Sequence, residues 1–272
     1  VCKRKFLMTM KLYPHHESTI ENIRKEFIAD DNVLAILVGG SIAHGYAKEN
    51  SDIDIVFVLT DKEYDRRKSG DNLLYFNREL CTYPDGYVDG KCVNLNYLRL
   101  VNEKGNEPTR YAFKDVFFIF CKDDSIKKLI EGIPVFNESA REDHARRFFA
   151  QLTAWKWFLS EGKKHKNHYL ENLAVSNFVM YSCRLILNHN RLLYPFQKWL
   201  LKETEKAEQK PEKFMRNIHK LLKNRKPKLM ERIYSDLKNM KLCDFDETKW
   251  GTFFHKDIET TWMQHDPYIA DL

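Results

Sequence analysis

The stretch LVGGSIAHGYAKENSDIDIVFVL, residues 37–59, joins two apolar runs through a glycine-rich turn. The second run opens with Asp52-Ile53-Asp54. Side chains alternate between the two faces of a strand, so Asp52 and Asp54 are expected to point the same way. Two carboxylates at the start of an otherwise apolar strand suit a divalent cation better than they suit a core. The pattern therefore predicts a metal-binding strand.

The first apolar run ends in Gly39, Gly40 and Ser41. A glycine turn leading into a helix offers free backbone N–H groups, and Ser41 adds a hydroxyl, which together favour a bound anion. We expect Gly39, Gly40 and Ser41 to hold phosphates beside the acid pair. The two features together predict a site for a nucleoside triphosphate.

These residues resemble the signature of the nucleotidyltransferases of the DNA polymerase beta type: Gly-Gly-Ser, then Asp-x-Asp about ten residues later. The resemblance implies an α/β (α+β) catalytic domain with a mixed sheet, followed by an all-α helical bundle. It also implies ATP or another NTP as substrate and two Mg²⁺ ions bound by Asp52 and Asp54. Within that superfamily, the domain order is similar to the antibiotic nucleotidyltransferases that act on aminoglycosides and lincosamides.

A third acidic residue, on a later strand, is part of what the resemblance implies. Residues 84–97 read as a hairpin, with the two-residue turn Asp89-Gly90. The strand after that turn places Asn94 where an acid is expected, so Asn94 becomes the third candidate metal ligand and the second ion is expected to bind weakly. Three alternatives stay open: an enzyme with a weakened metal site, an enzyme using another acid such as Asp89, or a nucleotide-binding or regulatory protein without catalysis.

The chain changes character after Pro134. Strand and helix patterns mix up to about residue 135, which predicts a catalytic domain over residues 1–135. Helical periodicity then dominates, which predicts a helical acceptor-binding domain over residues 136–272. We expect its helices at about 142–159, 168–189, 195–203, 211–224 and 227–240.

Two residues of the helical half are candidates for the site. Glu142 opens the first long helix and is a candidate general base, as such a residue is in the antibiotic-modifying relatives; the alternative is a favourable interaction with the helix dipole. Lys198 follows Pro195 on an expected helix and is a candidate for binding the triphosphate; the alternative is a solvated lysine.

Composition limits the class of protein. The net charge of +6 is a mild basic excess, which fits a polyanionic substrate as well as plain solubility. The six cysteines show no paired metal spacing, so we expect free thiols in a reducing cytoplasm. No apolar run approaches a membrane span and no signal peptide is evident, so a cytoplasmic protein without membrane segments is expected.

The sequence thus predicts a Mg²⁺-dependent nucleotidyltransferase. It is expected to move a nucleoside monophosphate from an NTP, ATP in the first instance, to a hydroxyl of a small, aminoglycoside-like molecule, with release of pyrophosphate. Nucleic acid is an unlikely partner, and a monomer or homodimer is expected. The alternatives are the non-catalytic nucleotide binder and an antitoxin-like enzyme that AMPylates a protein.

Overall fold

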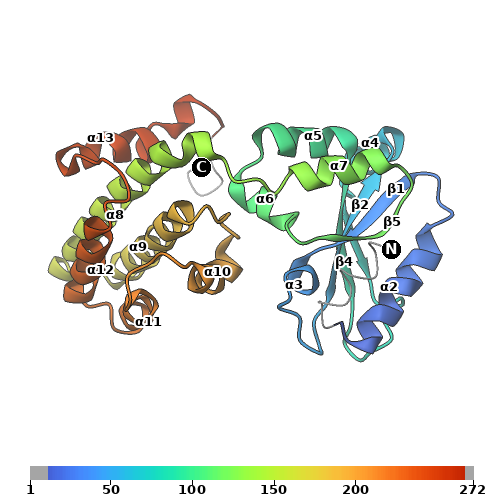
Figure 1. Cartoon of the computed structure of the whole chain (residues 1–272), viewed down its shortest axis with the longest axis horizontal. Coiled ribbons are helices and arrows are strands. Elements are labelled where there is room, and N and C mark those ends of the chain that lie inside the picture. Colours follow the sequence, from blue (N-terminus) through green and yellow to red (C-terminus); the bar gives the residue numbers. More distant parts are fainter. Residues whose placement is uncertain (1–11, 267–272) are drawn as a thin grey trace. The chain divides into compact units, whose positions relative to one another are not determined.

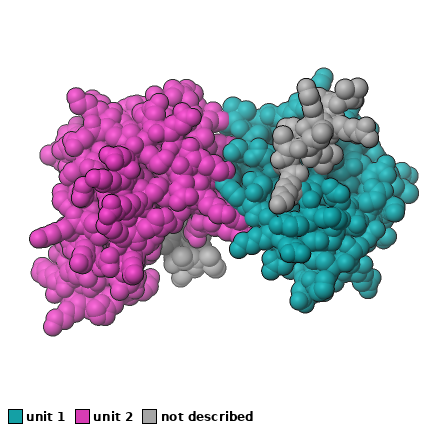
Figure 2. All heavy atoms as spheres, turned by 60° about the horizontal axis from the view of Figure 1, so that its bottom comes forward, with its two compact units in different colours: residues 1–135 teal, residues 136–272 magenta. Residues whose placement is uncertain are grey.

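The computed structural model describes residues 12–266, and the chain divides into two compact units, residues 1–135 and 136–272. Figure 2 shows the two units in different colours. Unit 1 contains a five-stranded sheet, and unit 2 is helical throughout its described part. The fold class is therefore α/β with a mixed sheet, followed by an all-α region, as the sequence predicts.

The sheet of unit 1 has the strand order β3-β4-β2-β1-β5. Strand β2 pairs antiparallel with β1 and parallel with β4, while β3 and β5 form the two edges. Because β2 and β4 are parallel, both strands begin at the same end of the sheet, and β1 ends there. The strands are β1 Val33–Val38, β2 Ile53–Leu59, β3 Leu74–Asn77, β4 Val88–Asn94 and β5 Phe117–Cys121.

Helices cover both faces of this sheet (Figure 1). Helix α2, Pro14–Phe27, packs on the face that carries Ile53 and Ile55. The opposite face, which carries Val56 and Val58, is covered by α5, α6 and α7. The central strands are buried on both sides, which explains their nearly continuous apolar sequences. The helices of this unit are α2, α3 Gly40–Ala43, α4 Asp61–Ser69, α5 Leu95–Lys104, α6 Glu107–Ala112 and α7 Asp124–Gly132.

The predicted hairpin turn at Asp89-Gly90 is wrong. Both residues lie inside β4, and the connection between the antiparallel strands β3 and β4 runs over residues 78–87. Position 90 requires glycine because the neighbouring strand is close: a Cβ atom would lie 2.7 Å from Ile55 Cγ1. A glycine inside a strand often marks such a close approach, and here the dipeptide that favours a turn serves packing instead.

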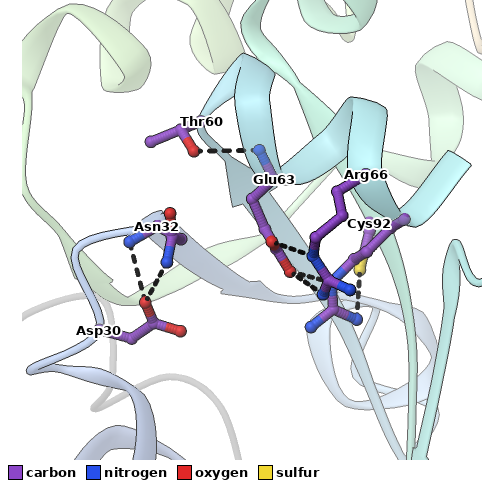
Figure 3. Close-up of polar contacts among 7 residues, drawn as sticks. Asp30, Asn32, Thr60, Glu63, Arg66 and Cys92 are labelled. Carbon is purple, nitrogen blue, oxygen red and sulfur yellow. Dashed lines mark hydrogen bonds and ion pairs between the residues drawn. The ribbon is translucent and has the colours of Figure 1, made fainter.

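Helix α4 is a charged surface helix that begins directly after β2. The Thr60 hydroxyl accepts a hydrogen bond from the Glu63 N–H and caps the helix (Figure 3). Glu63 binds Arg66 and Arg67 at 2.7 Å and 2.8 Å, and Arg67 also reaches Cys92 Sγ on β4 at 3.7 Å (Figure 3). These hydrogen bonds from the two guanidinium groups lower the pKa of Glu63 to about 2.

Unit 2 has a separate hydrophobic core built around α8 and α9, with Phe178 fully buried in it. The predicted long helices are present, and the segment after Pro195 differs: a 3₁₀ turn, η2 Gln197–Trp199, precedes the short helix α10. The remaining elements of the unit are η1 Glu138–Ala140, α8 Arg141–Lys164, α9 His168–His189, α10 Leu200–Lys206, α11 Phe214–Asn224, α12 Pro227–Asn239, η3 Glu247–Lys249, α13 Trp250–Phe254, η4 His255–Glu259 and η5 Thr261–Met263.

Two expectations from composition are answered for residues 12–266. The five cysteines in this range are free, and Cys2 lies outside it. None of the helices within residues 12–266 has the length and apolar character that crossing a bilayer requires.

Candidate functional site

The glycine turn and the acid strand are in direct contact. The Gly39 N–H donates to the backbone oxygen of Asp54 at 2.9 Å. Gly40 has φ of +56°, and a Cβ atom on it would lie 1.7 Å from Asp54 Oδ2. Only glycine fits this position, because the Asp54 carboxylate occupies the space of a side chain and the backbone is left-handed. The turn after β1 is therefore built around Asp54.

Ser41 follows in the short helix α3 and is 6% exposed. Within residues 12–266 its hydroxyl has no hydrogen-bond partner. A buried hydroxyl without a partner is costly, and a native structure usually supplies one from a ligand or a water. Ser41 is thus placed beside Asp54's turn with an unused donor and acceptor, as the predicted phosphate site requires.

A third carboxylate lies beside the acid pair, and it is Asp89. In the parallel ladder Asp89 is in register with Asp54, so the two side chains share a face, and Asp52 is on the same face two residues earlier. Tyr87 lies near the group: interaction of its hydroxyl with the Asp52 carboxylate, together with the negative charges of Asp89 and Asp54, raises the pKa of Tyr87. The three carboxylates therefore gather at one end of the sheet.

Asn94 does not lie in this group, which corrects the prediction that it is the third metal ligand. It is in register with Leu59 at the far end of β4, about 16 Å along the strand from Asp89. Its side chain caps α5 by accepting from the Tyr97 N–H and donates to Asp61 Oδ1, both at 2.9 Å. Asn94 is a structural residue, and its amide is already committed.

Two residues that the sequence did not suggest for the site, His16 and Tyr83, bind the backbone directly before Asp52. His16 is completely buried, and its Nε2 bonds the Ser51 carbonyl at 3.1 Å. The Tyr83 hydroxyl donates to the same carbonyl at 2.7 Å. Burial is the main cause that lowers the pKa of His16. In the sequence, Pro14 indicates a helix that includes His16. The capping pattern at Ser18 and Glu21 instead predicts a helix that begins after His16.

Glu142 lies in unit 2, in the first turn of α8. Its Oε1 is 3.4 Å from Arg146 Nη1 and 3.4 Å from the Asp244 N–H. An acidic residue in this position also interacts favourably with the helix N-terminus. These contacts give Glu142 a structural role inside its own unit, and its role as a general base remains a prediction.

Lys198 is exposed in the 3₁₀ turn η2 rather than on a regular helix as expected. Its Nζ lies 4.9 Å from the centre of the Trp199 ring, in a cation–π contact. The role of Lys198 in binding a triphosphate stays a prediction.

Unit 2 also contains a polar cavity of about 200 Å³. Gln151 lines it at 2% exposure, and neither atom of its amide has a partner among the described residues. The other lining residues come from α8, α9 and η4: His144, Arg147, Phe148, Tyr181, Arg184, Asp257 and Ile258.

The carboxylates of unit 1 fit Mg²⁺ by their chemistry. Hard oxygen donors suit this ion, which is usually bound by one or two carboxylates together with substrate phosphates rather than by a protein cage. Within residues 12–266 no three His, Cys, Asp or Glu side chains form a group that could hold a metal ion by themselves. Asp52, Asp54 and Asp89 thus form no ready-made metal site, and an ion would need oxygen ligands from the nucleotide as well.

Comparison with known proteins agrees with this geometry. Residues 21–96 match the family model described as polymerase beta, nucleotidyltransferase. Among solved structures, the chain is similar to a nucleotidyltransferase-like protein from Exiguobacterium sibiricum 255-15, with 13% identity and a TM-score of 0.45 over 94% of this chain and 83% of that one. No curated protein matches. The match over residues 21–96, which include the glycine turn and all three carboxylates, makes this part of the chain similar to the nucleotidyltransferase domain of the polymerase beta type.

Proposed function

We propose that unit 1 transfers a nucleoside monophosphate from an NTP, with ATP as the first donor to test, to a hydroxyl group of a small molecule. One observation carries this proposal: the end of β1 and the starts of β2 and β4 bring Gly40, Asp54 and Asp89 together. A phosphate-binding turn beside three carboxylates is what nucleotidyl transfer needs, because catalysis rests on positioning and on electrostatic stabilisation.

Each group has a distinct role in the proposal. The backbone N–H groups at Gly40 and Ser41, with the Ser41 hydroxyl, hold the phosphates that leave as pyrophosphate. Asp52, Asp54 and Asp89 hold Mg²⁺, which when bound would neutralise the charge that develops on the phosphates. His16 and Tyr83 fix the Ser51 carbonyl and so orient the strand that presents Asp52.

The alternative is a non-catalytic nucleotide binder; the position of Asp89 in register with Asp54 supports the catalytic proposal over it. Among catalytic functions, the nature of the acceptor separates the alternatives. A small-molecule acceptor gives a soluble nucleotidylated product. Protein AMPylation would instead add the mass of one nucleotide to a co-expressed protein.

The test is pyrophosphate release from ATP, GTP, CTP and UTP with Mg²⁺, across a panel of hydroxyl compounds. We expect Asp54→Asn to lower the rate at least about 100-fold, because it removes a metal-binding charge. Asp85→Asn is the matched control: Asp85 is exposed in the nearby connection and has φ of +59°, which asparagine also tolerates. Equal rates for the two variants, or no release by the unsubstituted protein, would refute the proposal.

A further inference from the structure

An aromatic surface lies beside the acid group, on the edge strand β3. Phe76 is 60% exposed, although a phenyl ring in water is unfavourable. Its ring contacts the Tyr87 ring at a centroid distance of 5.4 Å. The Arg78 guanidinium lies over both rings, 5.6 Å from the centre of Phe76 and 5.8 Å from that of Tyr87. We call Phe76, Tyr87 and Arg78 the aromatic platform.

The register of the sheet places this platform next to the carboxylates. Phe76 is in register with Asp89, and Asp89 is in register with Asp54, so the three side chains follow one another across a single face. Phe76 is two strands from Asp54, a separation of about 10 Å. Tyr87 directly precedes β4 and is two residues from Asp89, so it adjoins the acid group as well as the platform.

The geometry of nucleotidyl transfer indicates on which side of the acid group the acceptor binds. In nucleotidyl transfer the attacking hydroxyl and the leaving pyrophosphate lie on opposite sides of the α-phosphorus. The turn proposed to hold the leaving phosphates is on the β1 side of Asp54. The hydroxyl must then approach from the opposite side, where β4 and β3 carry Asp89 and Phe76.

We propose that the aromatic platform binds the acceptor, and that the acceptor is a ring-containing hydroxyl compound that is uncharged or anionic. This inference rests on the nucleotidyl transfer proposed above. An exposed aromatic face stacks on a flat ring or on the C–H face of a sugar. A molecule that stacks on Phe76 comes into contact with the Arg78 guanidinium, because the guanidinium lies over the same ring.

Charge on the same face narrows the class of acceptor. Lys91 is exposed and in register with Leu74, so its ammonium group is on the platform's face of β4 and β3. Together with Arg78 it places two positive charges around the approach to Asp89. They attract a carboxylate or phosphate substituent, whereas the three carboxylates of the acid group attract cations unless Mg²⁺ is bound. With Mg²⁺ bound, the charges around the platform therefore favour acceptors outside the aminoglycoside class.

Binding is tested with Mg²⁺ but without nucleotide, so that the acid group is neutralised and the result does not depend on turnover. The probes are phenyl β-D-glucoside, which is neutral, phenyl β-D-glucuronide, which is anionic, and kanamycin, which is polycationic. Amide NMR shifts of Asn77, Asp89 and Lys91 report binding at the platform. We expect both phenyl probes to shift these amides, the glucuronide more tightly, and kanamycin to leave them unchanged at equal concentration.

Two substitutions separate the ring from the charge. Phe76→Ala should weaken both phenyl probes about tenfold, which is the usual loss when a stacking ring is removed. Arg78→Gln should weaken the glucuronide about fivefold more than the glucoside. Tyr169→Ala is the control, because Tyr169 is an equally exposed aromatic residue, 76% exposed, on α9 of unit 2. Circular dichroism melting confirms that each variant is folded.

The inference is overturned if neither phenyl probe shifts these amides, if Phe76→Ala has no more effect than Tyr169→Ala, or if kanamycin binds the platform more tightly than the glucuronide. A failure of nucleotidyl transfer is seen separately, as absence of pyrophosphate release while the phenyl probes still bind. An acceptor found by turnover should also lose affinity with Phe76→Ala, as a raised KM for the acceptor at an unchanged KM for the NTP.

Discussion

Asp89 and Asn94 lie on the same strand, and the sheet places Asp89 rather than Asn94 beside Asp54, contrary to what the local sequence suggests. Asp89 stands in a dipeptide that favours a turn, and Asn94 stands in the apolar context expected of a metal ligand. The parallel register with β2 determines which of the two lies near the acid pair, because it pairs Asp89 with Asp54 and Asn94 with Leu59. Register between distant strands is a property of the folded sheet, so no local pattern could reveal it.

A pair of substitutions tests this assignment. Asp89→Asn should lower pyrophosphate release about 100-fold with little change in stability, because Asp89 is exposed. Asn94→Asp should give no gain in rate and should lower the free energy of unfolding by about 1–3 kcal/mol, because it sets a carboxylate against Asp61. Urea unfolding and rate measurements on both variants suffice. A faster Asn94→Asp enzyme would return the metal site to Asn94.

Gly40 shows what the turn around Asp54 requires. Gly40→Ala should reduce pyrophosphate release at least about 100-fold, because the new methyl group must displace the Asp54 carboxylate. Gly45→Ala provides the matched control: Gly45 also has a left-handed backbone, with φ of +71°, and no atom lies within 4 Å of its Cβ position. Both variants carry the backbone strain of about 1–2 kcal/mol, and only the first carries the clash. Similar rates in the two would show that the contact is unimportant.

The local part of the candidate site could be predicted from the sequence. Gly40, Ser41, Asp52 and Asp54 lie within one short segment whose periodicity fixes which side chains share a face. His16 could not be found this way, because its burial depends on a loop far along the chain whose Ser51 carbonyl it binds.

At the scale of single elements, periodicity and capping predicted the strands and the long helices well. Helix α9 begins and ends at the predicted residues, His168 and His189. The errors fall where two local signals compete. Pro14 begins α2, although Ser18 and Glu21 form a capping pattern, and in the structure the Ser18 hydroxyl bonds back to the Pro14 oxygen inside the helix.

The first turn of α4 gives the fold a dependence on acid. The pKa of Glu63 is lowered to about 2, so its contacts with Arg66 and Arg67 stabilise the protein fully above the unfolded-state pKa of about 4.3. That stabilisation is lost as the pH falls from about 4.3 towards about 2. Exposure to solvent limits the contribution to about 1 kcal/mol.

Glu63→Gln should therefore be less stable than the parent protein by about 1 kcal/mol at pH 7, measured by urea unfolding. The difference should shrink steadily below pH 4.3. Lys62→Gln, on the same helix, controls for a change of charge alone. A gap that stays constant down to pH 2.5 would show that the ion pairs do not stabilise α4.

At the scale of the whole molecule, the two units have separate cores. The sheet core of unit 1 and the helical core of unit 2 share no buried residue among those described. The change in character after Pro134 was visible in the sequence, because mixed strand and helix patterns give way to helical periodicity alone. Which strands pair within unit 1 was not visible, since the pairing joins segments far apart in the chain.

Separate cores predict separate unfolding. Phe178→Ala should cost unit 2 about 3–5 kcal/mol, because it removes a fully buried ring from the core between α8 and α9. Hydrogen exchange should then become faster in α8 and α9 while the amides of β1 and β2 keep their protection. Ile36→Ala is the reciprocal variant in unit 1. Loss of protection in both units from either substitution would show one cooperative structure.

The parallel pairing of β2 with β4 also orders events during synthesis. The glycine turn and the acid pair leave the ribosome first, yet Asp54 has no partner strand on its β4 side until Val88–Asn94 has been made. The intervening segment, with α4 and β3, must be closed as a loop before this pairing forms, which makes it a slow step. The helices α5, α6 and α7 that cover one face of β2 and β4 are made later still. A nascent chain stalled after β4 should therefore not yet bind a nucleotide, and binding should appear only when the segment through α7 has emerged.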